Sequence, residues 1–315
     1  MIERPAVSQE PVKSQKLKFL FWIIGILLLF VIAYCVGLSL YVGWSLTHPE
    51  KTALTESPQD YHLAHDHVTF MSRDGKVRLS GWNIAPQPDA ADRQTTLIFA
   101  HGYKQNRLNG TLETLQLAKD LTAEGFTVLL FDFRNAGESE GDMTSVGYFE
   151  KQDLLGAVDF ALEINPHHTI GVIGFSMGAA TGIIAAAEDK RIAAVVADSP
   201  FHDLRDYLKD NLSIWSDLPY FPFTPLIISL IPPLTGTNID DVSPIEAVQQ
   251  VSPRPILFIH STNDERIPHT SSESMYNKDP NHFQYWETHN EGHAKTYNDD
   301  PQQYVKRVVS LFDSI

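Results

Sequence analysis

One five-residue run, Gly174-Phe175-Ser176-Met177-Gly178, constrains the fold of this chain more than any other feature. The apolar, β-branched residues 169–175 before it predict a buried strand. The small and apolar residues 177–187 after it predict a helix. Ser176 therefore stands at a strand-to-helix turn, and the flanking glycines suit a turn too tight for side chains. Such a turn exposes the serine hydroxyl above a sheet, which makes Ser176 a candidate nucleophile.

Strand-like and helix-like segments alternate on both sides of this turn. Near the start, residues 68–71 and 77–84 alternate in polarity around a turn at 73–76, which predicts a β-hairpin. The later predicted strands are residues 96–100, 127–131, 169–175, 192–197, 255–260 and 283–286. The predicted helices between them are residues 111–124, 148–164, 177–189, 244–251, 271–276 and 302–312. This order predicts an α/β fold with a mostly parallel, eight-stranded sheet and helices on both faces.

The N-terminal region predicts a membrane anchor. Residues 19–47 contain no charged side chain, and a helix needs only about 20 such residues to cross a bilayer. Lys13, Lys16 and Lys18 precede the segment, which predicts a cytoplasmic N-terminus and a catalytic domain outside the cytoplasm. A cleaved signal peptide is the alternative, but its apolar core spans only about 7–15 residues.

The sequence thus divides into four expected parts of a single-pass protein of the cell membrane. Residues 1–18 form a cytoplasmic N-terminus, and residues 19–47 form an uncleaved signal-anchor. Residues 48–65 form a polar tether, and residues 66–315 form the α/β domain.

Residues 201–241 break the alternation of strands and helices. Their prolines exclude a second membrane span, because proline removes helix donors and clashes with the preceding turn. Long irregular insertions in compact domains are typically functional, so a small cap over the site is expected here. The cap residues expected to line a substrate pocket are aromatic or apolar: Tyr207, Leu212, Trp215, Tyr220, Phe221 and Phe223.

A nucleophilic serine needs a base, and the base needs a carboxylate that orients it. After a serine in such a turn, the carboxylate and then the histidine follow along the chain. Asp264 is the first candidate for the acid, because it follows the strand at 255–260. Glu265, one residue along, and Asp198, after the preceding strand, are the alternatives.

The candidate base is His293, in the loop between the last predicted strand and the terminal helix. His289 is the main alternative, whereas His282 precedes the strand and is expected at the wrong end of the sheet.

Two backbone N–H groups are expected to stabilise a developing oxyanion. One belongs to Met177, directly after the serine. The other belongs to Tyr103, in the loop that follows the strand at 96–100. His101 in the same loop is expected to shape the turn rather than to react.

Net charge and composition limit the kinds of partner and cofactor expected for this chain. The formal net charge of −15 argues against a nucleic-acid partner, which would need a basic surface. The single cysteine, Cys35, excludes an intrachain disulfide. His62, His65 and His67 are expected to be solvated and not to bind a metal. The chemistry expected of Ser176, His293 and Asp264 needs neither a metal nor an organic cofactor. The sequence does not predict an oligomeric state.

Five segments of the chain together resemble the α/β-hydrolase superfamily in order and spacing. They are His101-Gly102, the segment from Asp132 to Ser139, the serine turn, the Asp264 loop and Gly292-His293. The chain looks most like its membrane-anchored branch, related to Bem46, ABHD13 and the bacterial hydrolases grouped with S33 serine aminopeptidases. The resemblance implies a serine hydrolase of acyl esters, without cofactor, acting on a small or lipid-like acyl substrate. A peptidase, a thioesterase or an acyltransferase with the same three residues is the alternative within enzymes. A non-catalytic binding protein on the same scaffold is the alternative outside them.

Overall fold

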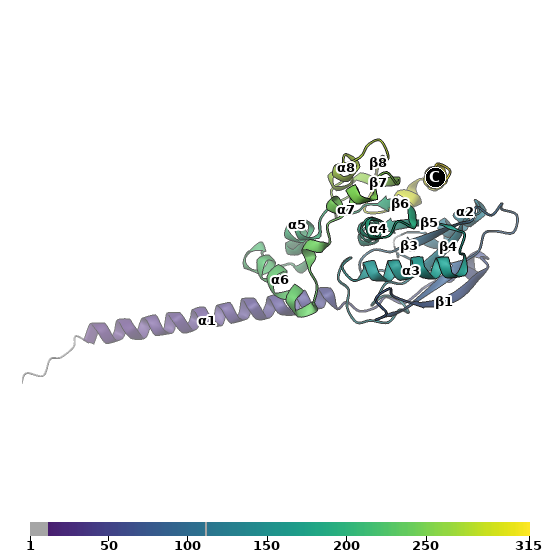
Figure 1. Ribbon diagram of the computed structural model, residues 1–315. Helices are drawn as coiled ribbons and strands as arrows, with labels where there is room; N and C mark the ends of the chain where they lie inside the picture. The colour runs from purple at the N-terminus through teal and green to yellow at the C-terminus, as the bar shows by residue number, and fades with distance from the viewer. Residues whose placement is uncertain (1–11, 111) are drawn as a thin grey trace, which may run out of the picture.

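The computed structural model describes residues 12–110 and 112–315, with a mostly parallel sheet at the centre of the domain (Figure 1). Its eight strands lie in the order β1-β2-β4-β3-β5-β6-β7-β8. Only the β1–β2 and β2–β4 pairs of this sheet are antiparallel. The predicted eight-stranded, mostly parallel sheet is confirmed. The strands are β1 (His65–Met71), β2 (Arg78–Ile84), β3 (Thr95–Ala100), β4 (Thr127–Phe131), β5 (Thr169–Phe175), β6 (Ile192–Asp198), β7 (Ile256–Asn263) and β8 (Gln284–Glu291).

Helices cover both faces of this sheet. Side chains alternate between the faces along each strand, so each face carries apolar side chains that need to be covered. Val172 of β5 belongs to the core cluster on one face and Ile173 to the cluster on the other. One face is packed by α3 (Glu150–Ile164), α4 (Met177–Glu188), α7 (Pro244–Val251) and α8 (Thr270–Tyr276). The other is packed by α2 (Thr114–Ala123), α9 (Thr296–Asp299) and α10 (Pro301–Phe312).

Two buried ion pairs fix the loop that follows β4. Asp132 accepts hydrogen bonds from the backbone N–H of Arg107 at 2.7 Å and from its Nη2 at 2.6 Å. Both of these side chains are fully buried. Arg134 in turn donates to Asp153 of α3 at 2.7 Å. These bonds indicate that the loop has a structural role.

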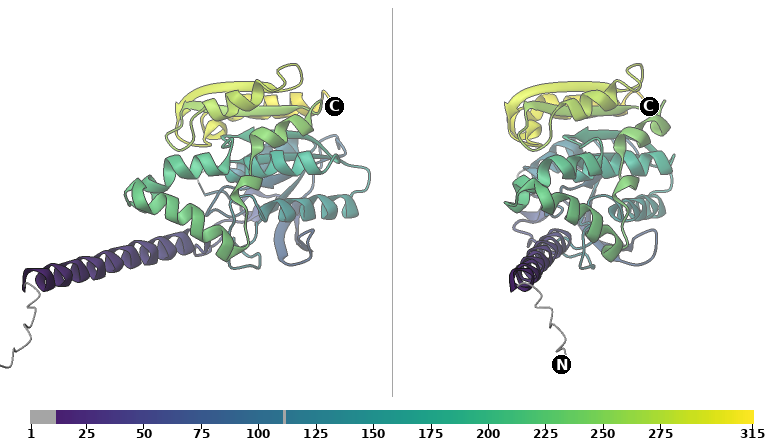
Figure 2. Two further views of the ribbon diagram at one scale, coloured as in Figure 1. Left: turned by 60° about the vertical axis from the view of Figure 1, so that its left-hand side comes forward. Right: turned by 90° about the vertical axis from the view of Figure 1, so that its left-hand side faces the viewer.

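The long N-terminal helix α1 (Val12–Thr47) projects from the domain (Figures 1 and 2). Residues 16–34 are almost entirely exposed, and residues 16–47 are long and apolar enough to cross a membrane. From residue 35 onward one side of the helix packs against the protein instead. Of the expected cytoplasmic N-terminus, residues 1–11 lie outside the described part of the chain.

The expected tether is not a loose linker. The backbone N–H of Thr144 donates to the carbonyl oxygen of Thr47 at 2.8 Å. The Asn135 amide donates to the carbonyl oxygen of Pro49 at 3.1 Å, and the Asn106 amide to that of Thr52 at 3.1 Å. Because one backbone N–H group and two side-chain amides of the domain donate to these carbonyl groups, the segment after α1 is fixed to the domain.

The cap expected at 201–241 consists of two helices, α5 (Leu204–Ser216) and α6 (Tyr220–Thr235), followed by a short 3-10 turn, Ile239–Asp241. The segment is therefore helical and not irregular, despite its prolines. Asp203 caps α5 by accepting a hydrogen bond from the backbone N–H of Asp206. Pro222 directly follows the kink at Phe221, at a helix start where the N–H group lacks an intrahelical partner. Pro225, Pro232 and Pro233 lie inside α6.

We expect Asp132→Asn to lower the free energy of unfolding by about 3–5 kcal/mol, because it leaves the buried Arg107 guanidinium without its main counter-charge. The exposed pair of Arg205 and Asp240 provides a control. Asp240→Asn is expected to cost less than about 1 kcal/mol. Urea denaturation of the detergent-solubilised protein measures both values. Equal, small losses for the two variants would contradict the structural role given to the buried pair.

Candidate active site

Ser176 occupies a strained turn between β5 and α4. Its φ of 55° and ψ of −117° lie outside the regions that L-residues ordinarily adopt. A Cβ atom on Gly174 would lie 2.5 Å from the Ala179 Cα, and one on Gly178 only 2.0 Å from the Ala100 carbonyl oxygen. The backbone N–H of Ser176 donates to the carbonyl oxygen of Asp198 at 2.8 Å. The turn thus requires both glycines and directs Ser176 away from the sheet.

Asp264 and His293 form a hydrogen-bonded pair at the carboxyl edge of the same sheet. His293 Nδ1 lies 2.7 Å from Asp264 Oδ2, and the Asp264 side chain is fully buried. Burial alone would raise the pKa of Asp264, but hydrogen bonds from His260 and His293 hold it below its usual range. The carboxylate therefore remains charged next to the imidazole.

The alternative residues have other partners. Asp198 accepts a hydrogen bond from the Ser199 hydroxyl at 2.9 Å, and Glu265 is exposed. His289 Nδ1 lies 2.9 Å from the Thr262 hydroxyl, and His282 Nδ1 lies 2.7 Å from an Asp279 carboxylate oxygen. Among the described residues, the geometry brings together Asp264 and His293.

His260 is a part of the site that the sequence analysis missed. Its Nε2 lies 3.2 Å from Asp264 Oδ2 and 3.0 Å from the Ile267 carbonyl oxygen, both of which are acceptors. Nε2 therefore carries a proton, and Nδ1 accepts from the Ser272 hydroxyl at 2.7 Å. This fully buried histidine contacts the same Asp264 oxygen, Oδ2, as His293 does. The only signal in the sequence was a histidine at the end of an apolar strand.

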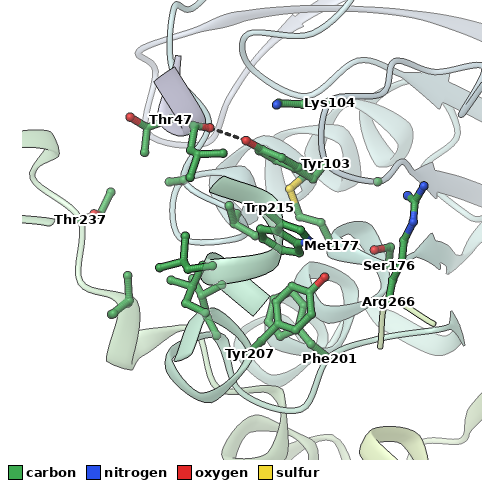
Figure 3. Close-up of a pocket in the computed structure, with 18 of the residues that line it drawn as sticks. Thr47, Tyr103, Lys104, Ser176, Met177, Phe201, Tyr207, Trp215, Thr237 and Arg266 are labelled. Atoms are coloured by element: carbon green, nitrogen blue, oxygen red, sulfur yellow. Dashed lines mark hydrogen bonds between the residues drawn. The ribbon is translucent and has the colours of Figure 1, made fainter. Parts of the chain in front are cut away.

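A cavity of about 520 Å³ opens at Ser176, and its lining includes His293, Tyr103 and Met177 (Figure 3). The two residues proposed as oxyanion donors thus lie at the same cavity as the serine. His101 behind them is buried, with Nδ1 2.8 Å from the Gly102 carbonyl oxygen and Nε2 accepting from the Phe133 N–H at 3.0 Å. This ring shapes the turn, as the sequence indicated.

The cap supplies three of the six expected pocket residues: Tyr207, Leu212 and Trp215. Tyr220 and Phe221 are not in the lining and are 51% and 78% exposed. The reason is the non-helical backbone of Phe221, which puts both residues at the exposed end of the cap. Phe223 is buried but also lies outside the lining.

Other lining residues were not expected from the sequence. Three come from the end of α1, namely Gly43, Leu46 and Thr47, and several isoleucines come from α6. Two exposed cations, Lys104 and Arg266, also border the cavity. Among residues 12–110 and 112–315, no three metal-ligating side chains are close enough to hold an ion.

Aromatic rings form one wall of this cavity. Phe201 stacks on Tyr207 with ring centroids 5.4 Å apart, and Tyr207 meets Trp215 edge-on at 5.0 Å. Tyr103 lies parallel to Trp215 at 6.5 Å, which joins the cap to the loop after β3. This rigid, apolar wall suits a hydrocarbon or an aromatic group.

Comparison with known proteins agrees with this architecture. A sequence profile of the alpha/beta hydrolase fold matches residues 95–221. The Bacillus subtilis protein YqkD is 32% identical over 240 residues, covering 75% of this chain and 76% of that protein. Mouse lysophosphatidylserine lipase ABHD12 is 23% identical over 243 residues, covering 70% of this chain and 58% of that one. The structure of the Pyrococcus furiosus esterase Pf2001 matches with a TM-score of 0.70 and 27% identity, covering 85% of this chain and 98% of the esterase.

The buried Asp198 carboxyl predicts a pH-dependent stability. Burial raises its pKa to about 7, so at pH 5 the folded protein holds a proton that the unfolded chain has lost. The contribution of Asp198 to the free energy of unfolding therefore falls as the pH rises from about 4 to 7. We expect Asp198→Asn to gain thermal stability relative to the wild type between pH 5 and pH 8. A melting-temperature difference that does not change with pH would contradict this assignment.

Proposed function

Because this chain belongs to the α/β-hydrolase family, we propose that it is a serine hydrolase that cleaves acyl esters through an acyl-enzyme. One observation carries the proposal. Ser176 stands on a strained turn at a cavity that it shares with His293, and His293 is hydrogen-bonded to the buried Asp264. These observations support the roles of nucleophile, base and orienting acid that acyl transfer needs.

In the proposed mechanism, the Ser176 hydroxyl oxygen attacks the carbonyl carbon of the ester and its proton passes to His293 Nε2. Nε2 is the nitrogen available for this role, because Nδ1 faces Asp264. The backbone N–H groups of Tyr103 and Met177 stabilise the tetrahedral oxyanion. The intermediate expels the alcohol, which takes the proton from His293. Water, deprotonated by His293, then attacks the acyl-enzyme. The carboxylic acid leaves as His293 returns the proton to the Ser176 oxygen.

The cavity favours an acyl ester over a peptide. Its walls are mostly aliphatic and aromatic, and such a lining binds a hydrocarbon chain better than a charged peptide terminus. Pf2001 is named as an esterase, and ABHD12 is named as a lysophosphatidylserine lipase. A peptidase, a thioesterase or an acyltransferase would use the same three residues, and the fold alone does not distinguish them. A purely binding role is disfavoured, because all three residues are present and placed at one edge of the sheet.

We propose further that residues 19–47 anchor the protein in the cell membrane, with the N-terminus in the cytoplasm and residues 66–315 outside it. The exposed apolar surface of α1 and the lysines that precede it support this topology.

The central test is covalent labelling by a fluorophosphonate probe. We expect labelling of the wild type and its complete loss in Ser176→Ala. Hydrolysis of p-nitrophenyl butyrate by the same variant should fall by at least 10³-fold, in line with the loss of a catalytic serine. Ser213→Ala, on α5 and outside the cavity lining, serves as the matched control and should label normally.

Undiminished labelling of Ser176→Ala would exclude this nucleophile. A parallel series of p-nitrophenyl esters and aminoacyl anilides separates the alternatives. Faster cleavage of the anilides would replace the esterase proposal with a peptidase.

A further inference from the structure

We infer that the last turns of α1 form one wall of the acyl-binding site, so that the anchor helix itself selects a lipid-derived ester with one long acyl chain. This inference rests on the proposed ester hydrolase function. It gives α1 a role in specificity in addition to attachment.

The first observation is that α1 reaches the cavity that contains Ser176. Gly43, Leu46 and Thr47 belong to its lining. The Tyr103 hydroxyl donates a hydrogen bond to the Leu46 carbonyl oxygen, which ties the helix to the loop beside the serine (Figure 3). The residue proposed to supply an oxyanion donor is thus connected directly to the anchor.

The second observation is that the wall is closely packed. A Cβ atom on Gly43 would lie 2.3 Å from Ile231 Cγ1 of α6, so the two helices are in close contact at this glycine. Ser39, one turn earlier on the same side, is fully buried. Leu46 packs on the apolar cluster formed by Leu212, Ile227 and Ile231 of the cap. Small residues allow such close approach of two helices.

The third observation is how polarity is distributed along the cavity. Ser176, Arg266, Thr47 and Thr237 all line the cavity, and in the view of Figure 3 the first two are drawn on one side of Trp215 and the two threonines on the other. Leu46, Leu212 and the isoleucines of α6 supply the lining contributed by α1 and the cap. A volume of about 520 Å³ is in the range of sites that enclose one small ligand. The volume and the apolar lining from α1 and the cap therefore suit one acyl chain between the serine and α1.

The fourth observation concerns the position of the cavity relative to a membrane. Residues 16–47 form about 48 Å of helix, whereas the hydrocarbon core of a bilayer is about 30 Å thick. The turns of α1 that contact the cap therefore emerge at the membrane surface. The turn between α5 and α6 points along α1 toward its N-terminal end (Figures 1 and 2). The ends of the two helices next to this turn expose Ile214, Tyr220 and Phe221. Apolar and aromatic side chains of this kind favour the membrane interface, which places the cavity next to a source of acyl lipids.

Leu46→Trp in the full-length protein, kept in detergent micelles, tests the wall. The larger side chain should fill the α1 end of the cavity and lower the ratio of p-nitrophenyl palmitate to p-nitrophenyl butyrate hydrolysis at least tenfold. Ser45→Trp is the matched control, because Ser45 is exposed on the same turn and lies outside the lining. Its ratio should stay within twofold of the wild type.

Leu46→Ala covers the case in which the tryptophan variant does not fold, as judged by fluorophosphonate labelling. Removing side-chain volume should raise the same ratio. An unchanged ratio in a labelled Leu46 variant, with hydrolysis still dependent on Ser176, would overturn the inference and leave the proposed function intact. Hydrolysis that persists in Ser176→Ala would instead reject the proposed function.

Natural lipids test the substrate class. Release of palmitate from 1-palmitoyl-lysophosphatidylglycerol should exceed release from dipalmitoyl-phosphatidylglycerol at least tenfold, since the cavity suits one chain. Equal rates on the two lipids would overturn the single-chain part of the inference.

Discussion

The close contact between β5, α4 and the end of β3 is the constraint on which the site depends. Gly174 and Gly178 have no side chains, so the backbone can turn sharply enough to hold Ser176 at a φ of 55°. Because β5 is central in the sheet, the carboxyl ends of its neighbours converge around this serine. The loops after β3, β7 and β8 then supply Tyr103, Asp264 and His293 without a long excursion of the chain. A larger residue at either glycine would disturb the turn and the packing of α4 together.

Buried polar contacts keep these loops in place. Asp132 binds Arg107 behind the loop after β3, and His260 and the backbone N–H of Ile267 hold Asp264 after β7. Charged groups removed from water need such partners, since an unpaired buried charge is costly. The same principle explains why the pKa values of the two carboxyl groups near the site shift in opposite directions. Asp264 has enough donors to stay ionised, whereas burial of Asp198 raises its pKa to about 7.

The features that were predicted best from the sequence are those that local sequence patterns determine. The apolar strands, the glycine-flanked serine and the order of acid and histidine each leave a short signature. The sequence also predicted a cap, but not that the cap would be helical, because three prolines lie inside α6 where proline ordinarily disfavours a helix. Tyr220 and Phe221 were expected in the pocket from residue type alone, and the kink at Phe221 places them outside it. His260 was missed because its role exists only once the loop after β7 folds back on the strand.

The contribution of α1 to the wall of the cavity could not be predicted from the sequence, and the reason is physical. Helix segments that face lipid and segments that face an apolar cavity both require uncharged side chains, so one composition satisfies both environments. Only contacts with residues nearly 200 positions later, such as that of Gly43 with Ile231, distinguish the last turns from the rest of the helix. An enzyme that takes its substrate from a membrane can therefore use a single helix both to reach the bilayer and to build its acyl site. Under this arrangement, the fixed hydrogen bonds of residues 47–53 to the domain are a requirement, because a flexible tether would leave the cavity without one wall.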